Sequence, residues 1–248
     1  MSDLLTEDLK GLTVVSTEGD DIAVVDGLVR DGDDVRALQL AKTGLFGGSM
    51  DEVLPVGCIV GIGPDAVMVG SAEPFVLPED LDEVEAEADI VSEDAPTLDE
   101  APGTWLRFTE ASHRDVISSD DGECVGRVDR FVVHPTEHRV WSIRLDKVPD
   151  MLRYLSWRNV DDFGDVVSVA NSKVLRLPDG PREERIRRDY GMITKKVLTD
   201  TGHELDRIED VTFDTDSGEL VALLLEDGSV LTGSRVIGVG PYAVIVAH

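Results

Sequence analysis

The residues that could do chemistry form three small groups. His134-Pro135-Thr136-Glu137-His138 holds two imidazoles and a carboxylate, which are ligand types of a transition-metal site. Pro135 separates the imidazoles at a predicted turn, so we interpret them as turn residues. Asp214-Thr215-Asp216-Ser217-Gly218 resembles the start of a calcium loop, but Glu219 and Leu225 stand where such a loop needs glycine and glutamate. We therefore predict a hairpin turn there.

The third group is the pair of cysteines, Cys58 and Cys124. Both lie beside apolar residues, and neither has a neighbouring histidine or a CxxC spacing. We predict two buried thiols in a reducing cytoplasm rather than nucleophiles. No Ser-His-Asp arrangement can be argued, and among 51 acidic residues carboxylate pairs occur by chance. We therefore expect a protein that is not an enzyme, with no catalytic residue, cofactor or metal.

Two stretches are better candidates for protein contacts. Leu45 and Phe46 stand in a glycine-flanked loop, either as an exposed anchor or folded over the mouth of a barrel. A basic stretch stands out in an acidic chain, either as a solvated linker with local ion pairs or as a dock for an acidic segment such as residues 73–100. Its arginines are Arg182, Arg185, Arg187 and Arg188.

The net charge of −28 is unevenly spread, with −21 in residues 1–100 and −7 in residues 101–248. Such a surface repels phosphate backbones, which disfavours general nucleic-acid binding. Asp (32) outnumbers Glu (19) and Arg (17) outnumbers Lys (6). This bias favours a halophilic protein, because the ~3 Å screening length of ~1 M salt removes self-repulsion. An acidic protein from a GC-rich mesophile is the alternative.

Membrane and export signals do not occur in the sequence. No apolar run approaches the ~20 residues of a membrane span. The first eight residues have neither a basic region nor a long apolar run, so they do not form a signal peptide. We expect a cytoplasmic protein without membrane insertion.

Short apolar strands separated by turn signals recur in three copies, the pattern of small barrels. The strands predicted in the first copy are residues 9–15, 22–29, 35–40, 52–55, 58–62 and 66–69. Those predicted in the second copy are residues 109–117, 125–133, 140–145, 165–169 and 174–177, with residues 151–157 in place of the middle loop. The third copy, residues 186–248, has its hairpin turn at 214–218 and its third strand at 219–225.

The copies match at both ends. Gly19–Gly27 corresponds to Gly122–Arg130 and, 183 residues further on, to Gly202–Asp210. Val60–Val69 corresponds to Ile237–Val246, 177 residues further on. The third copy therefore lacks six residues, which we place near Gly44 to Gly48, because loops tolerate deletion. We expect residues 9–71 and 186–248 to share one strand order.

An acidic linker follows the first copy. Residues 73–100 hold twelve acidic residues, no basic residue and three prolines. Self-repulsion and proline should keep this stretch extended and mostly unpacked. The predicted domain boundaries are 5–75, 76–103 for the linker, 104–180 and 181–248.

These motifs, in this order, resemble the PRC-barrel family. Leu9-Lys10-Gly11-Leu12-Thr13-Val14 matches its leading Leu-x-Gly-x-x-Val, and Gly19–Gly27 matches its Gly-x-x-Ile/Val-Gly-x-Val-x-Asp stretch. A glycine-rich loop, Leu54-Pro55 and Ile62-Gly63-Pro64-Asp65-Ala66-Val67 supply the rest. The departures from the family pattern are Ala23 and Gly27 in the first copy, the lost ending in the second, and Asp206 and Tyr242 in the third.

The resemblance implies an all-β protein of tandem small PRC-type β-barrels that serve as binding modules. Similar members include the cytoplasmic part of the photosynthetic reaction-centre H subunit and the C-terminal domain of a 16S RNA-processing factor. Haloarchaeal members associate with the cell-division machinery. We therefore expect a non-enzymatic cytoplasmic scaffold, associated with cell division, that binds a protein partner or itself. The alternative is an RNA-processing or ribosome-associated factor, which the arginine stretch would support.

Overall fold

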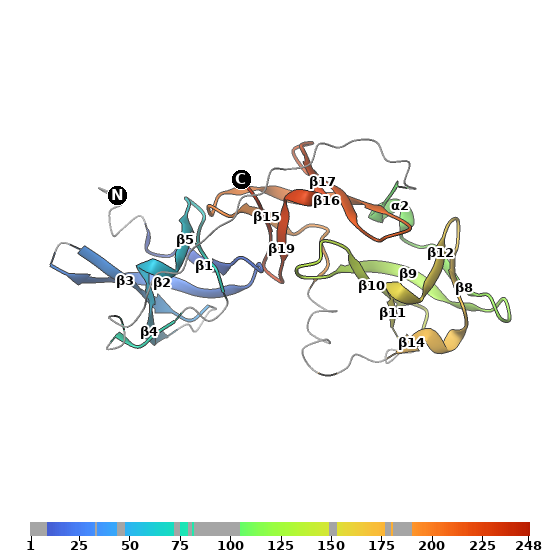
Figure 1. Ribbon diagram of the computed structural model, residues 1–248, viewed down its shortest axis with the longest axis horizontal. Coiled ribbons are helices and arrows are strands. Elements are labelled where there is room, and N and C mark those ends of the chain that lie inside the picture. The colour runs from blue at the N-terminus through green and yellow to red at the C-terminus, as the bar shows by residue number, and fades with distance from the viewer. Residues whose placement is uncertain are drawn as a thin grey trace. The chain divides into compact units, whose positions relative to one another are not determined.

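The protein is nearly all β, with three curled sheets and one helix in the described residues of its computed structural model (Figure 1). This confirms the fold class expected from the sequence. No helix in these ranges is long and apolar enough to cross a membrane. The structure describes residues 9–32, 34–43, 48–71, 75–78, 81, 105–148, 153–176, 180 and 190–248.

The first sheet is built from residues of the first copy alone. Its strands are β1 (Thr13–Ser16), β2 (Asp21–Asp31), β3 (Asp34–Ala41), β4 (Ser49–Pro55), β5 (Ile59–Ile62) and β6 (Ala66–Val69). They lie in the order β4-β3-β2-β1-β6-β5. A parallel pairing of β1 with β6, with Val14 opposite Val67, brings the closing hairpin back to the start of the copy. The core is aliphatic, with Val14, Leu38 and Leu54 fully buried.

The middle sheet repeats this arrangement and adds one strand. Its strands are β8 (Asp115–Ser118), β9 (Cys124–Val133), β10 (Val140–Asp146), β11 (Tyr154–Ser156), β12 (Val160–Phe163), β13 (Val167–Val169) and β14 (Leu175–Arg176). Their order is β12-β13-β8-β9-β10-β11-β14. As in the first sheet, the first and sixth strands of the copy, β8 and β13, pair in parallel.

The third sheet has the strand order of the first. Its strands are β15 (Lys196–Thr199), β16 (Glu204–Asp214), β17 (Leu220–Leu225), β18 (Val230–Thr232), β19 (Val236–Val239) and β20 (Ala243–Val246), with β7 (Trp105–Arg107) on β16. The order β18-β17-β16-β15-β20-β19 confirms the predicted repeat. A short 3-10 turn links the fourth and fifth strands of each copy, at Val56–Cys58, Trp157–Asn159 and Gly233–Arg235.

Strand register refines the predicted six-residue gap. Leu28 faces Leu38, and Leu38 faces Leu54 in the first sheet. The corresponding third-sheet residues are Val211, Leu223 and Leu231, which lie 183, 185 and 177 residues further on. The hairpin between β16 and β17 is thus two residues longer than its counterpart, and the next loop is eight residues shorter. The net difference is the six residues inferred from the sequence.

The strand predictions for the middle copy need three corrections. The expected strand at 109–117 is helix α2 (Phe108–Ala111) followed by β8, because a tertiary contact described below caps that turn. Residues 154–156, assigned to a loop, form the fourth strand β11. The closing hairpin is β12–β13 rather than 165–177, and residues 172–174 form a 3-10 turn before β14.

Residues just after the first copy also pack on its sheet. Val76 pairs with Val53 of β4, and Phe75 packs against the aliphatic core. The first folded region therefore extends beyond residue 71, into the stretch for which we expected an unpacked linker. The remainder of that stretch, apart from Leu77, Pro78 and Leu81, lies outside the described residues.

The chain divides into two compact units. The first holds the first sheet together with Leu198–Leu205 and Ile245–His248, and the second holds the middle sheet and the remaining strands of the third. Within the first unit, Asp65 accepts the N–H of Glu204 at 2.9 Å, and Gly202 accepts the N–H of Ala66 at 3.1 Å. A side chain at Gly63 would lie 2.2 Å from the Gly202 carbonyl oxygen, so this contact requires glycine there.

Candidate protein-contact site

Each copy enters its first strand through the same backbone turn. Gly11, His113 and Thr194 all have left-handed backbones, with φ of 92°, 68° and 67°. Each donates its N–H to the long second strand of its own copy, Gly11 and His113 at 2.8 Å to Val25 and Val128. The glycine of the leading motif therefore occupies a position that favours glycine, and the other two copies hold it with other residues. We call the residues just before this turn the lead segment of a copy.

In the second unit the lead segments cross over between copies. Strand β7, in the lead segment of the middle copy, pairs with β16 of the third copy, with Leu106 opposite Phe213. In return, Tyr190 in the lead segment of the third copy accepts the N–H of Val133 at the end of β9. Each lead segment thus lies on the long strand of the other copy, which ties the two sheets together.

Asp210 fixes one of these crossed segments. It is buried in β16, and its carboxylate accepts hydrogen bonds from the backbone N–H and the hydroxyl of Thr109 in helix α2. Its Oδ1 also accepts the N–H of Val211 at 2.8 Å. A carboxylate at the start of a helical turn satisfies N–H groups that have no partner within the turn. Asp210 is the acidic residue of the repeated glycine motif, so here it caps a neighbouring copy.

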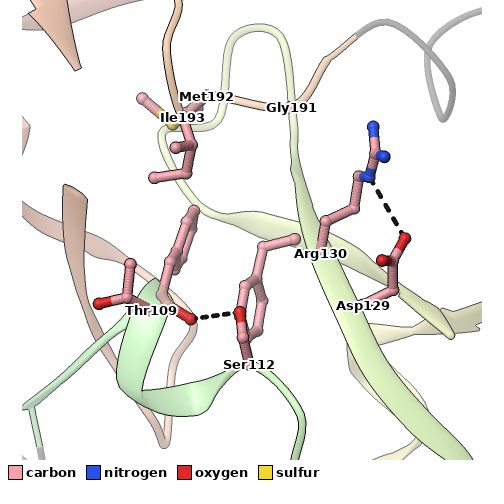
Figure 2. A pocket seen from close by; sticks show the side chains of 9 residues that line it. Thr109, Ser112, Asp129, Arg130, Gly191, Met192 and Ile193 are labelled. Atoms are coloured by element: carbon pink, nitrogen blue, oxygen red, sulfur yellow. Dashed lines mark hydrogen bonds and ion pairs between the residues drawn. The ribbon is translucent and has the colours of Figure 1, made fainter. Parts of the chain in front are cut away.

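A hollow of about 380 Å³ lies where the two lead segments meet β9 (Figure 2). Its apolar base contains the buried side chains of Phe108, Phe131 and Met192. Ile193, on its rim, is 39% exposed. The other lining residues are Thr109, Ser112, Asp129, Arg130 and Gly191. An apolar base with a polar rim is the make-up of a protein-contact patch.

Charges beside the hollow alternate in sign. Asp129 Oδ2 lies 3.4 Å from Arg130 Nε and 3.2 Å from Arg144 Nε, so one carboxylate serves two guanidinium groups. One strand position earlier, Arg127 donates to Asp115 at 2.9 Å, and this hydrogen bond raises the pKa of the Arg127 guanidinium. These arginines therefore form a mixed face rather than a continuous basic one.

The two histidines of the sequence motif take part in the turn between β9 and β10. His134 Nδ1 accepts the N–H of Glu137 at 3.2 Å, and burial lowers the pKa of the His134 imidazole. His138 has a left-handed backbone, and its Nε2 lies 3.4 Å from the Ile237 carbonyl oxygen. In the described ranges, no three His, Cys, Asp or Glu side chains gather as metal ligands.

The cysteine prediction was half wrong. Cys58 is partly buried, and desolvation raises the pKa of its thiol, as expected for a structural cysteine. Cys124 is exposed. It is the first residue of β9, at the end of the strand, where the alternation of buried and exposed positions has not yet begun.

The contact candidates chosen from the sequence all lie outside the described residues. These are Leu45, Phe46, Arg182, Arg185, Arg187 and Arg188. The hollow was not anticipated, because Phe108 and Met192 are far apart in the sequence and meet only through the crossed lead segments. The acidic residue retained at Asp210 was a usable signal, since its counterparts Gly27 and Arg130 cannot accept a hydrogen bond through a carboxylate.

Comparison with known proteins gives one match. The sequence model of the PRC-barrel domain family matches residues 185–245, which contain the third sheet from β15 to β20 and the lead segment before it. No protein of curated function matches the chain.

Proposed function

We propose, on the premise that residues 185–245 form a PRC-barrel domain, that this chain is a non-enzymatic protein-interaction scaffold. The observation that carries the proposal is the hollow at the crossed lead segments. Its base is apolar, Ile193 is exposed on its rim, and the adjoining charges alternate. Such a surface suits an apolar anchor side chain from a partner protein, with polar contacts around it.

The wider setting of this scaffold is a finer proposal. A cytoplasmic location and a place beside the cell-division machinery rest on composition and on the family resemblance. Tandem modules would suit such a role, because linking binding sites raises the effective concentration of their partners. The rival, an RNA-processing factor, needs a basic surface for phosphate contacts. The alternation of Arg127, Arg130 and Arg144 with Asp115 and Asp129 weighs against that rival.

Photo-crosslinking from inside the cell tests the proposal. A photoreactive residue replaces Ile193 in one variant and Val166 in a matched control, which is equally exposed at 43% but lies away from the hollow. We expect the position-193 variant to crosslink a defined protein, identified by mass spectrometry, that the position-166 variant does not capture.

A charge at the rim supplies the second arm of the test. Ile193→Glu should weaken binding of the crosslinked protein by about tenfold or more, because an apolar anchor contact is replaced by a charge. Val166→Glu should leave binding unchanged. Equal crosslinking from both positions, or equal binding by both Glu variants, would remove the hollow as the contact site.

A further inference from the structure

In two of the three sheets, the chain itself covers the outer edge of the fourth strand. After β6, the chain returns to β4, where Val53 donates its N–H to Val76 at 2.8 Å and Val76 donates back at 3.1 Å. After β13, the chain returns to β11, where β14 pairs antiparallel with Leu175 opposite Leu155. The same structural step, an added antiparallel strand, therefore follows both copies.

The returning segments also share a sequence pattern. They read Phe75-Val76-Leu77-Pro78 and, 100 residues later, Leu175-Arg176-Leu177-Pro178. The pattern is an apolar residue, any residue, Leu and Pro, and its last two residues in the second segment lie outside the described ranges. Directly opposite residues of an antiparallel pair project to the same face. The first apolar residue therefore projects with buried Leu54 or Leu155, and Phe75 indeed packs on the first core.

The third sheet presents the same edge without such a strand. Strand β18 is last in its sheet, and no described strand pairs with its outer side. Leu231 pairs with Leu223 as Leu54 pairs with Leu38, so Val230 corresponds to Val53. Val53 is 3% exposed, whereas Val230 is 63% exposed. By this register the N–H and C=O of Val230 point away from β17, as those of Val53 point toward Val76.

We propose that the outer edge of β18 binds an extended segment of another protein, which adds antiparallel to the sheet with the pattern apolar-x-Leu-Pro. Strand addition of this kind takes affinity from main-chain hydrogen bonds and specificity from alternate side chains. The apolar residue lies opposite Leu231, the x residue pairs with Val230, and proline ends the pairing because it has no N–H.

Charge and pairing define the occupant further. Glu226 and Asp227 are exposed in the loop that leads into β18, and the chain carries a net charge of −28. The bound segment therefore carries basic residues beside its apolar ones, as residues 172–179 do with Lys173 and Arg176. A second copy of this chain is the less suitable source, because its own segments already pair with β4 and β11.

The test uses the full chain and a synthetic peptide with the sequence of residues 172–179, Ser-Lys-Val-Leu-Arg-Leu-Pro-Asp. Binding is followed by fluorescence anisotropy, and amide chemical shifts locate the site. We expect saturable binding with the largest shifts at Val230–Thr232. The control peptide has the Lys and Arg replaced by Glu, and it should bind about threefold or more weakly.

Two N-methylated peptides separate main-chain pairing from general stickiness without altering the protein. Methylation of the Arg nitrogen removes the N–H that faces Val230 and should weaken binding by about tenfold or more. Methylation of the preceding Leu nitrogen, which points away from the edge, should have little effect. A Val230→Pro variant, which loses its own outward N–H, should behave like the first peptide, and Val230→Ala should bind within about threefold of wild type.

Several outcomes would overturn the proposal. These are absence of binding, equal binding of the two methylated peptides, and chemical-shift changes confined to β4 or β11. A peptide that dissociates a dimer of the chain would identify a second copy as the occupant and reject another protein. The surface is separate from the hollow at Ile193, so this proposal and the crosslinking result can succeed or fail independently.

Discussion

The first sheet and the pair formed by the middle and third sheets solve the same folding problem differently. The first sheet closes on aliphatic side chains of its own copy, from Leu9 to Val69, with Phe75 added at the edge. The other two share an aromatic cluster formed by Phe108, Phe131, Trp157, Phe163 and Phe213. Four of the six phenylalanines of the chain lie in that cluster. One strand order can thus give either a self-contained module or an interdependent pair.

The difference depends on the lead segments. Leu9 turns inward to the core of its own sheet, whereas Phe108 carries its ring to a stack with Phe131, 4.4 Å between centroids, and to Phe213 at 5.3 Å. Phe213 belongs to the third copy and Phe131 to the middle one. The first copy should therefore unfold independently, and the other two should unfold together.

The largest expected effect comes from truncating the centre of the aromatic cluster. Phe213 is fully buried and contacts the other four rings, so Phe213→Ala should cost about 3–5 kcal/mol. In differential scanning calorimetry, the transition of the second unit should fall and remain a single transition. The matched change Leu54→Ala, in the first core, should cost about 2–5 kcal/mol in the other transition only. A third transition after Phe213→Ala would contradict the shared core.

A smaller effect should separate two glycines in corresponding hairpins. Gly32 and Gly218 have φ of 63° and 78°, but only Gly218 lies under a ring, where an added Cβ would be 2.7 Å from Trp157 Nε1. Gly32→Ala meets no atom within 4 Å and should cost only backbone strain, about 1–2 kcal/mol. Gly218→Ala adds a clash of about 1–3 kcal/mol to that strain. Chemical denaturation with tryptophan fluorescence measures both, and equal losses would show that Trp157 yields freely.

The smallest effect concerns pH and the same hairpin of the third copy. Asp214 Oδ1 accepts the N–H of Ser217 at 2.8 Å and that of Asp216 at 3.0 Å, and these bonds lower the pKa of its carboxyl. A lowered folded pKa gives stability that is present above the unfolded value, about 3.9, and is lost as pH falls through the folded value.

Asp214→Asn removes this titration but keeps an acceptor oxygen. Between pH 5 and pH 2.5, the melting temperature of the second unit should fall by about 2 °C less in the variant than in wild type, a small effect because the group is largely solvated. The transition of the first sheet should show the same pH dependence in both proteins. A larger acid loss in the variant would reverse the assigned sign.

Local signals were enough to predict most of the fold. Turn residues such as Gly19 and Gly202, and the closing hairpins around Gly63 and Gly240, identified the first and third sheets and their common order. The middle copy was harder because Tyr154–Ser156 is only three residues long, and its strand character comes from pairing with β10 rather than from a pattern. Helix α2 was missed because its cap, Asp210, is 101 residues away in the sequence.

The hollow and the strand edge differ in how far the sequence could reveal them. The hollow exists only because two lead segments cross, and no periodicity or spacing encodes that crossing. The edge was visible in principle, because apolar-x-Leu-Pro recurs at a spacing of 100 residues after two copies. It became interpretable only once Val76 and Arg176 were seen to pair with equivalent strands.

The pairing of β7 with β16 also has a consequence for synthesis on the ribosome. Leu106 must wait for Phe213, its partner 107 residues later, and elongation at ~5–20 residues per second makes that delay about 5–20 s. The first copy has its core by residue 75 and can fold as it emerges. The middle copy instead spends this interval as an incomplete sheet with aromatic side chains exposed, the kind of nascent intermediate that chaperones bind.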